Sequence, residues 1–398
     1  MGKMRGSGIV VLVSALLLVS GAALAQNLMV QCPGDTDGDM IPDLPGYENV
    51  VCKHVTAGDG YAVMPDGKLM YTFGFSEVPA GTTEPRVFAE RQLKAEFTGP
   101  HIVLREGDEL YLNLTNVGMV ARPDLFDAHS VHWHGIPNQG SIFDGLPESA
   151  PTVVIGATFP YYYSTAGRPG TYFYHCHVEV SEHMQMGMVG ALDVLPAQDG
   201  TPIGGFTKFA YNDGDGSTGY DVSKTLILAG FDSNFHDKHI RVQPLPFADM
   251  LDDYHTINGR GYPDTINPNP LGSVPENNNH FSQKHDSVIT VNQNQRLLLR
   301  IANISTTHLF TVRVLGIPMK VVGLDAKLLR NGATDLYFDT DSVTVSGGQA
   351  ADVLLDTTNV APGTYFFYTT NVGELINGGE ERGGMMTEIV VCPPGGCA

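Results

Sequence analysis

Short runs of alternating hydrophobic and polar residues, broken by turn residues, recur along most of the chain. In the first half such runs are His101 to Arg105, Leu110 to Leu114 and Val189 to Leu195. In the second half they include Leu297 to Ile301 and Ala351 to Leu355. Period-two alternation between Gly, Pro and Asp turns is typical of β-strands in sandwich domains. No long segment repeats hydrophobic residues every 3.6 positions, so the pattern predicts an all-β fold.

Two distant segments of the chain resemble each other. Gly170-Thr-Tyr-Phe-Tyr-His-Cys-His matches Gly363-Thr-Tyr-Phe-Phe-Tyr-Thr-Thr-Asn, and a Gly-Met pair and a closing strand follow each one. Two copies of one β-sandwich explain this repeat most simply. We therefore expect a first domain at residues 61–198 and a second at 224–398, joined by a Gly- and Asp-rich linker at 199–223.

The start of the chain has the composition of an export signal at residues 1–25. Lys3 and Arg5 precede an apolar run, and Ala23-Leu24-Ala25 is a small-residue cleavage site. No later hydrophobic run reaches the length of a membrane span. We therefore expect a periplasmic or secreted protein without a membrane span after signal removal. Residues 26–60 form a polar N-terminal segment rich in Cys and Asp.

Charge and cysteine content narrow the possible partners and bonds. The chain of 398 residues carries 43 acidic and 23 basic residues, a formal net charge of −20, which argues against nucleic acid as a partner. In an oxidising compartment, Cys32 and Cys52 are expected to pair, as are Cys392 and Cys397, although the sequence leaves other pairings open. This arrangement leaves Cys176 free to bind a metal ion.

Histidine is concentrated in two short segments. Six of the fourteen histidines lie in His129-Ser-Val-His132-Trp-His134 and in His175-Cys176-His177 followed by His183. Alternate residues of a β-strand point to opposite faces. His132 and His134 therefore share one face, as do His175 and His177, whereas Cys176 points to the other side. One strand thus supplies ligands to two metal sites.

The residue types at these positions predict copper at both sites. Two imidazoles, a thiolate and a weak thioether form the blue-copper electron-transfer set, and four imidazoles suit copper that reacts with a small oxidant. Zinc is an alternative, but zinc seldom uses Cys with Met in this spacing. The blue-copper site would take His129, Cys176, His183 and Met188, and the second site would take His132, His134, His175 and His177.

At these motifs the sequence resembles the multicopper oxidase family, which includes the laccases and is related to the copper nitrite reductases. Asp144-Gly-Leu-Pro and Ile257-Asn-Gly agree with the resemblance. It implies two Greek-key cupredoxin β-sandwich domains, with type 1 copper in the first and half of a type 2/type 3 copper cluster beside it. It further implies one-electron oxidation of a donor (a small molecule, a metal ion or a redox protein) and reduction of O2 to water. Asp144 is a candidate for proton delivery to the cluster.

The second domain departs from the family pattern, because it lacks the usual copper motifs. Aligning the repeats sets Thr369, Thr370 and Asn371 against His-Cys-His, and His308 is the only match to the upstream motif. The cluster would then need unusual residues or another polypeptide, and the resemblance makes a homotrimer plausible. Besides His308, the chain could contribute only five further histidines, which we expect mostly at the surface: residues 236, 239, 255, 280 and 285.

Two other functions stay open at the level of sequence. One is a copper nitrite reductase-like enzyme, in which His134 and His175 would bind the catalytic copper. The other is a blue-copper electron-transfer protein without turnover. Separately, Asp35, Asp37, Asp39 and Asp43 have the alternate spacing of oxygen ligands that suits Ca2+. A solvated acidic turn explains this loop equally well.

Overall fold

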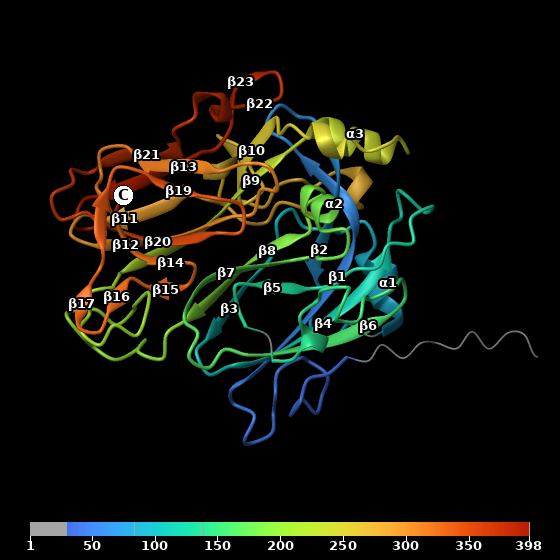
Figure 1. The fold of residues 1–398 in the computed structure, drawn as a ribbon, viewed down its shortest axis with the longest axis horizontal. Helices are drawn as coiled ribbons and strands as arrows, with labels where there is room; N and C mark the ends of the chain where they lie inside the picture. Colours follow the sequence, from blue (N-terminus) through green and yellow to red (C-terminus); the bar gives the residue numbers. More distant parts are fainter. Residues whose placement is uncertain (1–29, 83, 138, 398) are drawn as a thin grey trace, which may run out of the picture.

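The chain folds into two β-sandwich lobes. A computed structural model describes residues 30–82, 84–137 and 139–397, so the expected export signal lies outside the described residues. The first lobe is blue to green in Figure 1 and the second is yellow to red. The predicted all-β fold with two cupredoxin-like sandwiches is confirmed. Among the described residues, no helix is both long and apolar enough to cross a membrane.

Two four-stranded sheets make up the first lobe, in the orders β2-β1-β4-β6 and β3-β8-β7-β5. Its sheet begins at Val50, ahead of the expected boundary at residue 61. Phe73, Leu112 and Trp133 pack between the sheets and are at most 1% exposed. The strands are β1 (Val50–Val63), β2 (Leu69–Glu77), β3 (Gly99–Arg105), β4 (Glu109–Gly118), β5 (His132–His134), β6 (Thr158–Ser164), β7 (Gly170–His175) and β8 (Val189–Leu195).

The second lobe is also a sandwich of two sheets, which contain more strands than those of the first lobe. Their strand orders are β10-β9-β12-β20-β14-β15 and β11-β24-β21-β13-β19. Strand β18 also pairs with β14, and two hairpins, β16-β17 and β22-β23, lie outside these sheets. The main strands are β9 (Val222–Phe231), β10 (Tyr254–Ile257), β11 (Ile289–Asn292), β12 (Arg296–Asn303), β13 (Phe310–Val314), β14 (Met319–Leu324), β19 (Val343–Val345), β20 (Ala350–Asp356), β21 (Gly363–Thr369) and β24 (Met386–Cys392). The short ones are β15 (Lys327–Leu328), β16 (Arg330–Asn331), β17 (Thr334–Asp335), β18 (Phe338–Thr340), β22 (Ile376–Asn377) and β23 (Glu380–Gly383).

Helices are short and lie in the connections. They are α1 (Glu84–Arg91), α2 (Val180–Gln185) and α3 (Ser233–Ile240), with 3-10 turns η1 (Ser141–Phe143), η2 (Phe247–Asp249), η3 (Asp264–Ile266), η4 (Pro275–Asn277) and η5 (Val372–Leu375). The Asp232 carboxylate caps α3 by accepting from the amides of Asn234 and Phe235. Helix α3 belongs to the second half of the chain but packs on β2 of the first lobe, near α2 (Figure 1).

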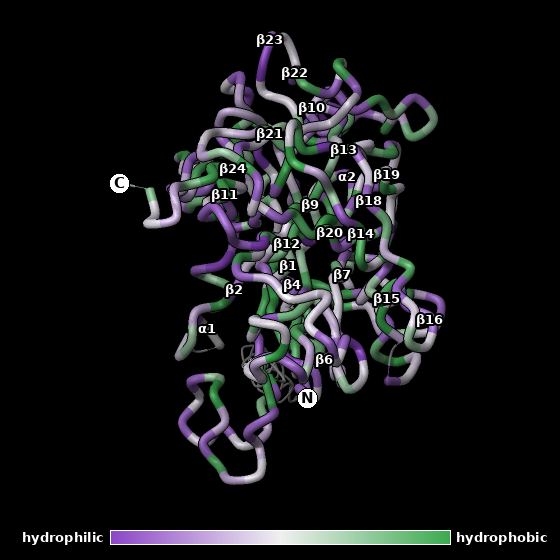
Figure 2. Tube along the Cα trace, turned by 90° about the vertical axis from the view of Figure 1, so that its left-hand side faces the viewer, coloured by the Kyte–Doolittle hydropathy of each residue, from purple (hydrophilic) through white to green (hydrophobic). Residues whose placement is uncertain are grey.

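The two lobes are joined by packed and polar contacts. Strand β7 packs against β12 and β20, and Thr171 on β7 donates to the Asp352 carboxylate on β20. The expected linker is itself packed, since Phe209 and Tyr211 are at most 3% exposed. In Figure 2, hydrophobic stretches run along interior strands such as β20, and hydrophilic stretches lie at the periphery, for example at β23.

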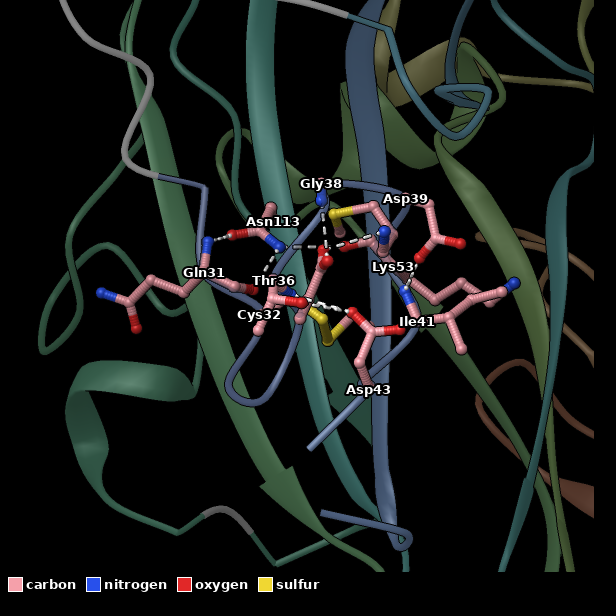
Figure 3. Close-up of a disulfide and its surroundings, with 12 residues drawn as sticks. Gln31, Cys32, Thr36, Gly38, Asp39, Ile41, Asp43, Lys53 and Asn113 are labelled. Atoms are coloured by element: carbon pink, nitrogen blue, oxygen red, sulfur yellow. Dashed lines mark hydrogen bonds between the residues drawn. A yellow bond between two sulfur atoms is a disulfide. The ribbon is translucent and has the colours of Figure 1, made fainter. Parts of the chain in front are cut away.

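Both predicted disulfides are confirmed. Cys32 bonds to Cys52, and Cys392 bonds to Cys397. Cys176 is free and buried. The first disulfide fastens the N-terminal loop to β1 (Figure 3).

Candidate metal centres

Three of the four predicted ligands of the first site converge in the first lobe at the end of β7, and the fourth, Met188, is buried next to them in the backbone hydrogen-bond network. Cys176 follows β7, His183 lies on α2 and Met188 precedes β8, and all are 0% exposed. His129 is equally buried and is held by two backbone hydrogen bonds to Val153. The Cys176 Sγ lies 3.2 Å from His183 Nδ1 and 3.9 Å from His129 Nδ1. A thiol and two imidazole nitrogens therefore point at one buried spot.

The backbone around Cys176 fixes this arrangement. Its amide donates to the Met188 carbonyl at 3.1 Å, and the Met188 amide donates to the His183 carbonyl at 2.9 Å. The Ser130 amide donates to Cys176 Sγ at 3.4 Å, which favours the thiolate. Burial raises the pKa of the Cys176 thiol to about 11 and lowers the pKa of His183 to about 4. Neutral imidazoles beside a buried thiol, which a bound cation would ionise, fit copper.

Carboxylates gather on the outer side of His183. Its Nε2 is buried and has no hydrogen-bond partner in the part of the chain that the structure describes, and it lies 3.9 Å from Asp127 Oδ2 and 3.8 Å from Glu179 Oε2. Glu182 belongs to the same group and accepts from His239 Nε2 on α3 at 2.8 Å. Several carboxylates of this negatively charged protein thus lie next to the predicted ligand His183.

The second predicted set lies on the opposite side of β7. Antiparallel pairing of β5 and β7 sets His132 opposite His175, with ring centroids 5.2 Å apart. Nitrogens of His132, His134 and His175 lie within 4.8 Å of one another. The His177 ring lies 5.2 Å from that of His132, although its nitrogens are outside this group. The predicted sharing of faces therefore describes the geometry, with three imidazoles closest together.

Two backbone carbonyls orient these imidazoles. His132 Nδ1 donates to the Asp144 carbonyl at 2.7 Å, and His175 Nδ1 donates to the Cys176 carbonyl at 2.9 Å. A carbonyl only accepts, so each Nδ1 carries the proton and each Nε2 keeps a lone pair for a metal ion. The Asp144 carboxylate also lies 3.3 Å from His132 Nδ1, so the predicted proton donor is at the site.

The four histidines open into a cleft of about 480 Å³ between the lobes. Its other wall comes from the second lobe of the same chain, at residues 305–309 and at Gly347 and Gly348. Gly348 has a φ of +89°, which favours glycine, and a Cβ there would lie 3.2 Å from His134 Nε2, closer than an ordinary contact. Among the described residues, His308 is the only histidine of the second lobe that lines the cleft.

Strand register corrects the alignment of the two copies. Phe310 pairs with Val345 as His129 pairs with Val153, so Phe310, and not His308, is the counterpart of His129. The match to His308 is wrong because it is displaced by two residues along β13. In the same register, the pair His132–His175 corresponds to Arg313–Tyr368. The expected match of Thr369, Thr370 and Asn371 to His-Cys-His is therefore also wrong by one residue, and the counterparts are residues 368–370.

The four histidines therefore have no imidazole counterpart in the second lobe. Counterparts of His132, His134, His175 and His177 are Arg313, Leu315, Tyr368 and Thr370 in the register of the paired strands. The expected lack of second-lobe histidines is therefore present in the structure, and none of the four positions in these strands holds a histidine. In an oligomer, the second lobe of a neighbouring copy would present these same four second-lobe side chains, none of which is an imidazole.

Sequence reasoning missed a third group of possible ligands. His255, His308 and Glu374 each direct one ligand atom to within 4.8 Å of the others. The expectation that His236, His239 and His255 lie at the surface is wrong, since all are at most 5% exposed. The strand Tyr254–Ile257 is buried throughout, and its apolar neighbours are the signal that could have identified His255 as an internal residue.

The acidic N-terminal loop brings three of its four predicted ligands together. Oxygens of Asp35, Asp37 and Asp39 lie within 4.8 Å of one another. Asp43 is outside this group and accepts from the Thr36 amide and hydroxyl (Figure 3). The other three carboxylates accept from backbone amides of the loop, which is how a self-bonded acidic turn behaves.

Comparisons with known proteins point to one family. Family models described as multicopper oxidase match residues 91–199 and 234–391. Among curated proteins, Laccase-2 of Oryza sativa subsp. japonica is 26% identical over 69% of this chain and 42% of its own length. Laccase-11 of Arabidopsis thaliana is 26% identical over 68% of this chain and 41% of its own length. The chain thus spans less than half the length of the curated relatives it matches.

Solved structures match the whole two-lobed fold. The blue copper oxidase of Nitrosomonas europaea superposes with a TM-score of 0.61 at 24% identity, covering 85% of each chain. The multicopper oxidase mgLAC superposes with a TM-score of 0.61 at 22% identity, covering 87% of this chain and 86% of the other. At these identities the likeness shows the shared fold.

Proposed function

The chain belongs to the multicopper oxidase family, a family of copper-binding oxidoreductases, and from this premise we propose that it oxidises a donor one electron at a time and reduces O2. Electrons would enter beside the site formed by His129, Cys176, His183 and Met188. Reduction of O2 would take place in the cleft of His132, His134, His175 and His177. Copper bound at these residues would supply the one-electron redox chemistry.

The connection between the two sites carries this proposal. Cys176 faces the core beside His129 and His183, whereas its sequence neighbour His175 faces the cleft. His175 Nδ1 also donates to the Cys176 carbonyl at 2.9 Å. A few covalent bonds and one hydrogen bond therefore link the thiol to the cleft, and the buried position of Cys176 excludes water from this path.

The residues around the cleft are suited to handle protons as well as electrons. Reduction of O2 to water consumes protons, so a proton donor must reach the cleft. The Asp144 carboxylate contacts His132 and its side chain is 20% exposed, so it can exchange protons with solvent. We assign proton delivery to Asp144, while its backbone carbonyl holds the His132 tautomer.

The donor that fits the acidic surface beside His183 is a cation, and a metal ion is the simplest one. Asp127, Glu179 and Glu182 form this surface. These carboxylates would attract a cation to this surface, and added salt would weaken the attraction. The export signal that the sequence predicts at residues 1–25, together with the two disulfides, favours the periplasm or the exterior as the compartment.

One observation favours a second function, that of a copper nitrite reductase-like enzyme. Among the described residues of this cleft, three imidazoles, those of His132, His134 and His175, converge within 4.8 Å. Three imidazoles are enough for one catalytic copper, and the second lobe has no counterparts of the four histidines. The expected homotrimer stays a prediction. In such a trimer, the second lobe of a neighbouring copy would present Arg313 and Tyr368, and not imidazoles, at the positions that correspond to His132 and His175.

The copper content of the loaded protein separates these functions. Three or four copper ions per chain, a blue absorption band and O2 uptake with a cationic donor support the oxidase. Two copper ions per chain with a nitrite-responsive magnetic-resonance signal support the reductase. One blue copper and no turnover would leave an electron carrier and exclude both enzymes.

A matched pair of variants tests the role of Cys176. Cys176→Ser is expected to abolish the blue absorption and the uptake of O2. Thr369→Ser changes the counterpart in the second lobe and keeps the hydroxyl that bonds to Glu374, so it is expected to leave both unchanged. A blue band that survives in Cys176→Ser overturns the assignment.

A further inference from the structure

We propose that the second lobe binds one divalent ion of borderline softness, Zn2+ or Cu2+, through His255, His308 and Glu374. Its three ligands are different residues from those of the two predicted copper sites, and one of them, His308, lines the same cleft as the four histidines. His255 comes from β10, His308 precedes β13 and Glu374 lies in η5. The three ligand atoms lie within 4.8 Å of one another, and a single ion bound about 2 Å from each would bring them slightly closer.

His255 is the first argument, because the protein leaves its ring without a partner. The residue is 5% exposed, and neither Nδ1 nor Nε2 has a hydrogen-bond partner within the described residues. Buried imidazoles are almost always hydrogen-bonded or bound to metal. The ring meets that of His308 edge-on at 5.3 Å. A metal ion between the two rings would use a nitrogen that otherwise has no function.

His308 is oriented as metal-binding histidines usually are. Its Nδ1 pairs with Asp252 Oδ2 at 2.9 Å, which leaves Nε2 as the free nitrogen. A carboxylate behind a ligand histidine fixes the tautomer and strengthens the nitrogen as a donor. Asp252 is held in turn by Thr307 Oγ1 at 2.6 Å and by Gln185 Nε2 at 3.0 Å. Asp252 is therefore held by more hydrogen bonds than a simple surface ion pair with His308 would need.

Glu374 provides the third ligand in a fixed position. It is 4% exposed, and it accepts from Asn371 Nδ2 at 2.9 Å and from the Thr369 hydroxyl. The Met385 amide donates to the Glu374 carbonyl at 2.9 Å, as the Met188 amide donates to that of His183. Glu374 is therefore the counterpart of His183. The second lobe has a carboxylate where the first has an imidazole, together with two histidines from other positions.

The donor set selects the kind of ion. Two nitrogens and one carboxylate oxygen suit Zn2+ and Cu2+, whereas Ca2+ and Mg2+ prefer all-oxygen sites and Cu(I) prefers sulfur. Three protein ligands leave a fourth position for water. The His308 side chain is 26% exposed and lines the cleft between the lobes, which gives the ion an entry path.

Metal binding tests the site without relying on activity, and Zn2+ is loaded before copper because Cu2+ binds nitrogen and oxygen ligands more tightly. We expect one Zn2+ per chain at this site, retained after dialysis and copper loading and measured by elemental analysis, and a zinc anomalous peak between His255 and His308 in crystals. His255→Gln should abolish this zinc and leave the blue absorption unchanged. Asp252→Asn should weaken zinc binding by about 10- to 100-fold. The blue band thus reports on the copper function separately.

Two further variants make the result decisive. His101 also pairs with a carboxylate, Asp193, at 2.9 Å but lies elsewhere, so His101→Gln should bind zinc as the parent does. Glu374→Gln keeps the size of the side chain and should weaken binding even if His255→Gln fails to fold. Unchanged zinc stoichiometry and affinity in these ligand variants, or an anomalous peak elsewhere, overturns the proposal.

Discussion

Cys176 and Thr369 occupy the same position in two copies of one β-sandwich. Each backbone amide donates to the carbonyl of a methionine, Met188 or Met385, and both bonds are 3.1 Å long. The amide of Met188 donates in turn to the His183 carbonyl at 2.9 Å, and the amide of Met385 donates to the Glu374 carbonyl at the same distance. The second lobe has therefore kept the backbone and the thioether of the first site and has different side chains at the other three positions.

Restoring these side chains should restore a blue-copper site in the second lobe. In a Cys176→Ser background, the triple variant Phe310→His, Thr369→Cys and Glu374→His is expected to recover blue absorption, because the backbone frame is already present. The measurement is the absorption spectrum together with copper per chain.

Thr369→Cys in the same Cys176→Ser background is the control for this graft. It keeps Phe310 and Glu374, so the second lobe lacks both imidazoles, and the protein is expected to stay colourless. Blue absorption in this single variant would contradict the register that pairs Phe310 with Val345.

Sequence periodicity identified the strands well but not the relation between the lobes. The run from Val189 to Leu195 is a strand with those same bounds, because alternation reports directly on which face is buried. The counterpart of His129 depends instead on cross-strand pairing, and a motif match placed it at His308 rather than at Phe310. No pairing information is encoded in a local motif, so this displacement could not be detected from sequence.

The third ligand group was missed for a related physical reason. His255, His308 and Glu374 come from three separate connections and strands, and only the closed sandwich brings them together. The first-lobe ligands were found because most of them lie within two short segments. Sequence therefore reveals sites built from adjacent residues and conceals sites built by topology.

Gln185 is predicted to be a key contact between the loop that carries His183 and the second lobe. It is 1% exposed, donates to Asp252 Oδ1 at 3.0 Å and accepts from the Asp232 amide at 3.0 Å. Gln185→Ala leaves both partners unsatisfied, so the free energy of unfolding should fall by about 2–4 kcal/mol in a urea titration. Gln243→Ala, which removes only exposed local bonds, should change it by less than about 0.5 kcal/mol. Equal losses in the two variants would contradict the role of Gln185.

His54 should make the protein sensitive to acid. Burial, together with the nearby Arg91 guanidinium, lowers the pKa of His54 to about 4, below its usual value of 6.5. Between about pH 6.5 and pH 4, His54 is protonated in the unfolded chain but neutral in the folded chain. The free energy of unfolding therefore decreases as the pH falls through this range. The loss from this residue should reach about 2–3 kcal/mol at pH 4.5.

A glutamine at position 54 tests this pH dependence. It can still bond to the Thr115 hydroxyl, which lies 2.8 Å from His54 Nε2. Denaturant titrations at pH 8 and pH 4.5 should therefore show a smaller difference for His54→Gln than for the parent. An identical difference in both proteins would assign the acid sensitivity to other groups.

Asp352 is predicted to hold the two lobes together through a buried charge. It is 1% exposed, its Oδ1 lies 3.6 Å from Arg300 Nη1, and Thr171 of the first lobe donates to the same oxygen. Asp352→Asn removes one of the two carboxylates near the buried Arg300 guanidinium, the other being Asp193, so unfolding in urea should require about 1–3 kcal/mol less free energy. Removing both charges with Arg300→Met and Asp352→Asn should recover part of this loss, because no under-compensated cation then remains beside position 352. If the double variant is less stable than the sum of the single variants predicts, the pair does not compensate itself, and Asp193 instead balances the charge of Arg300.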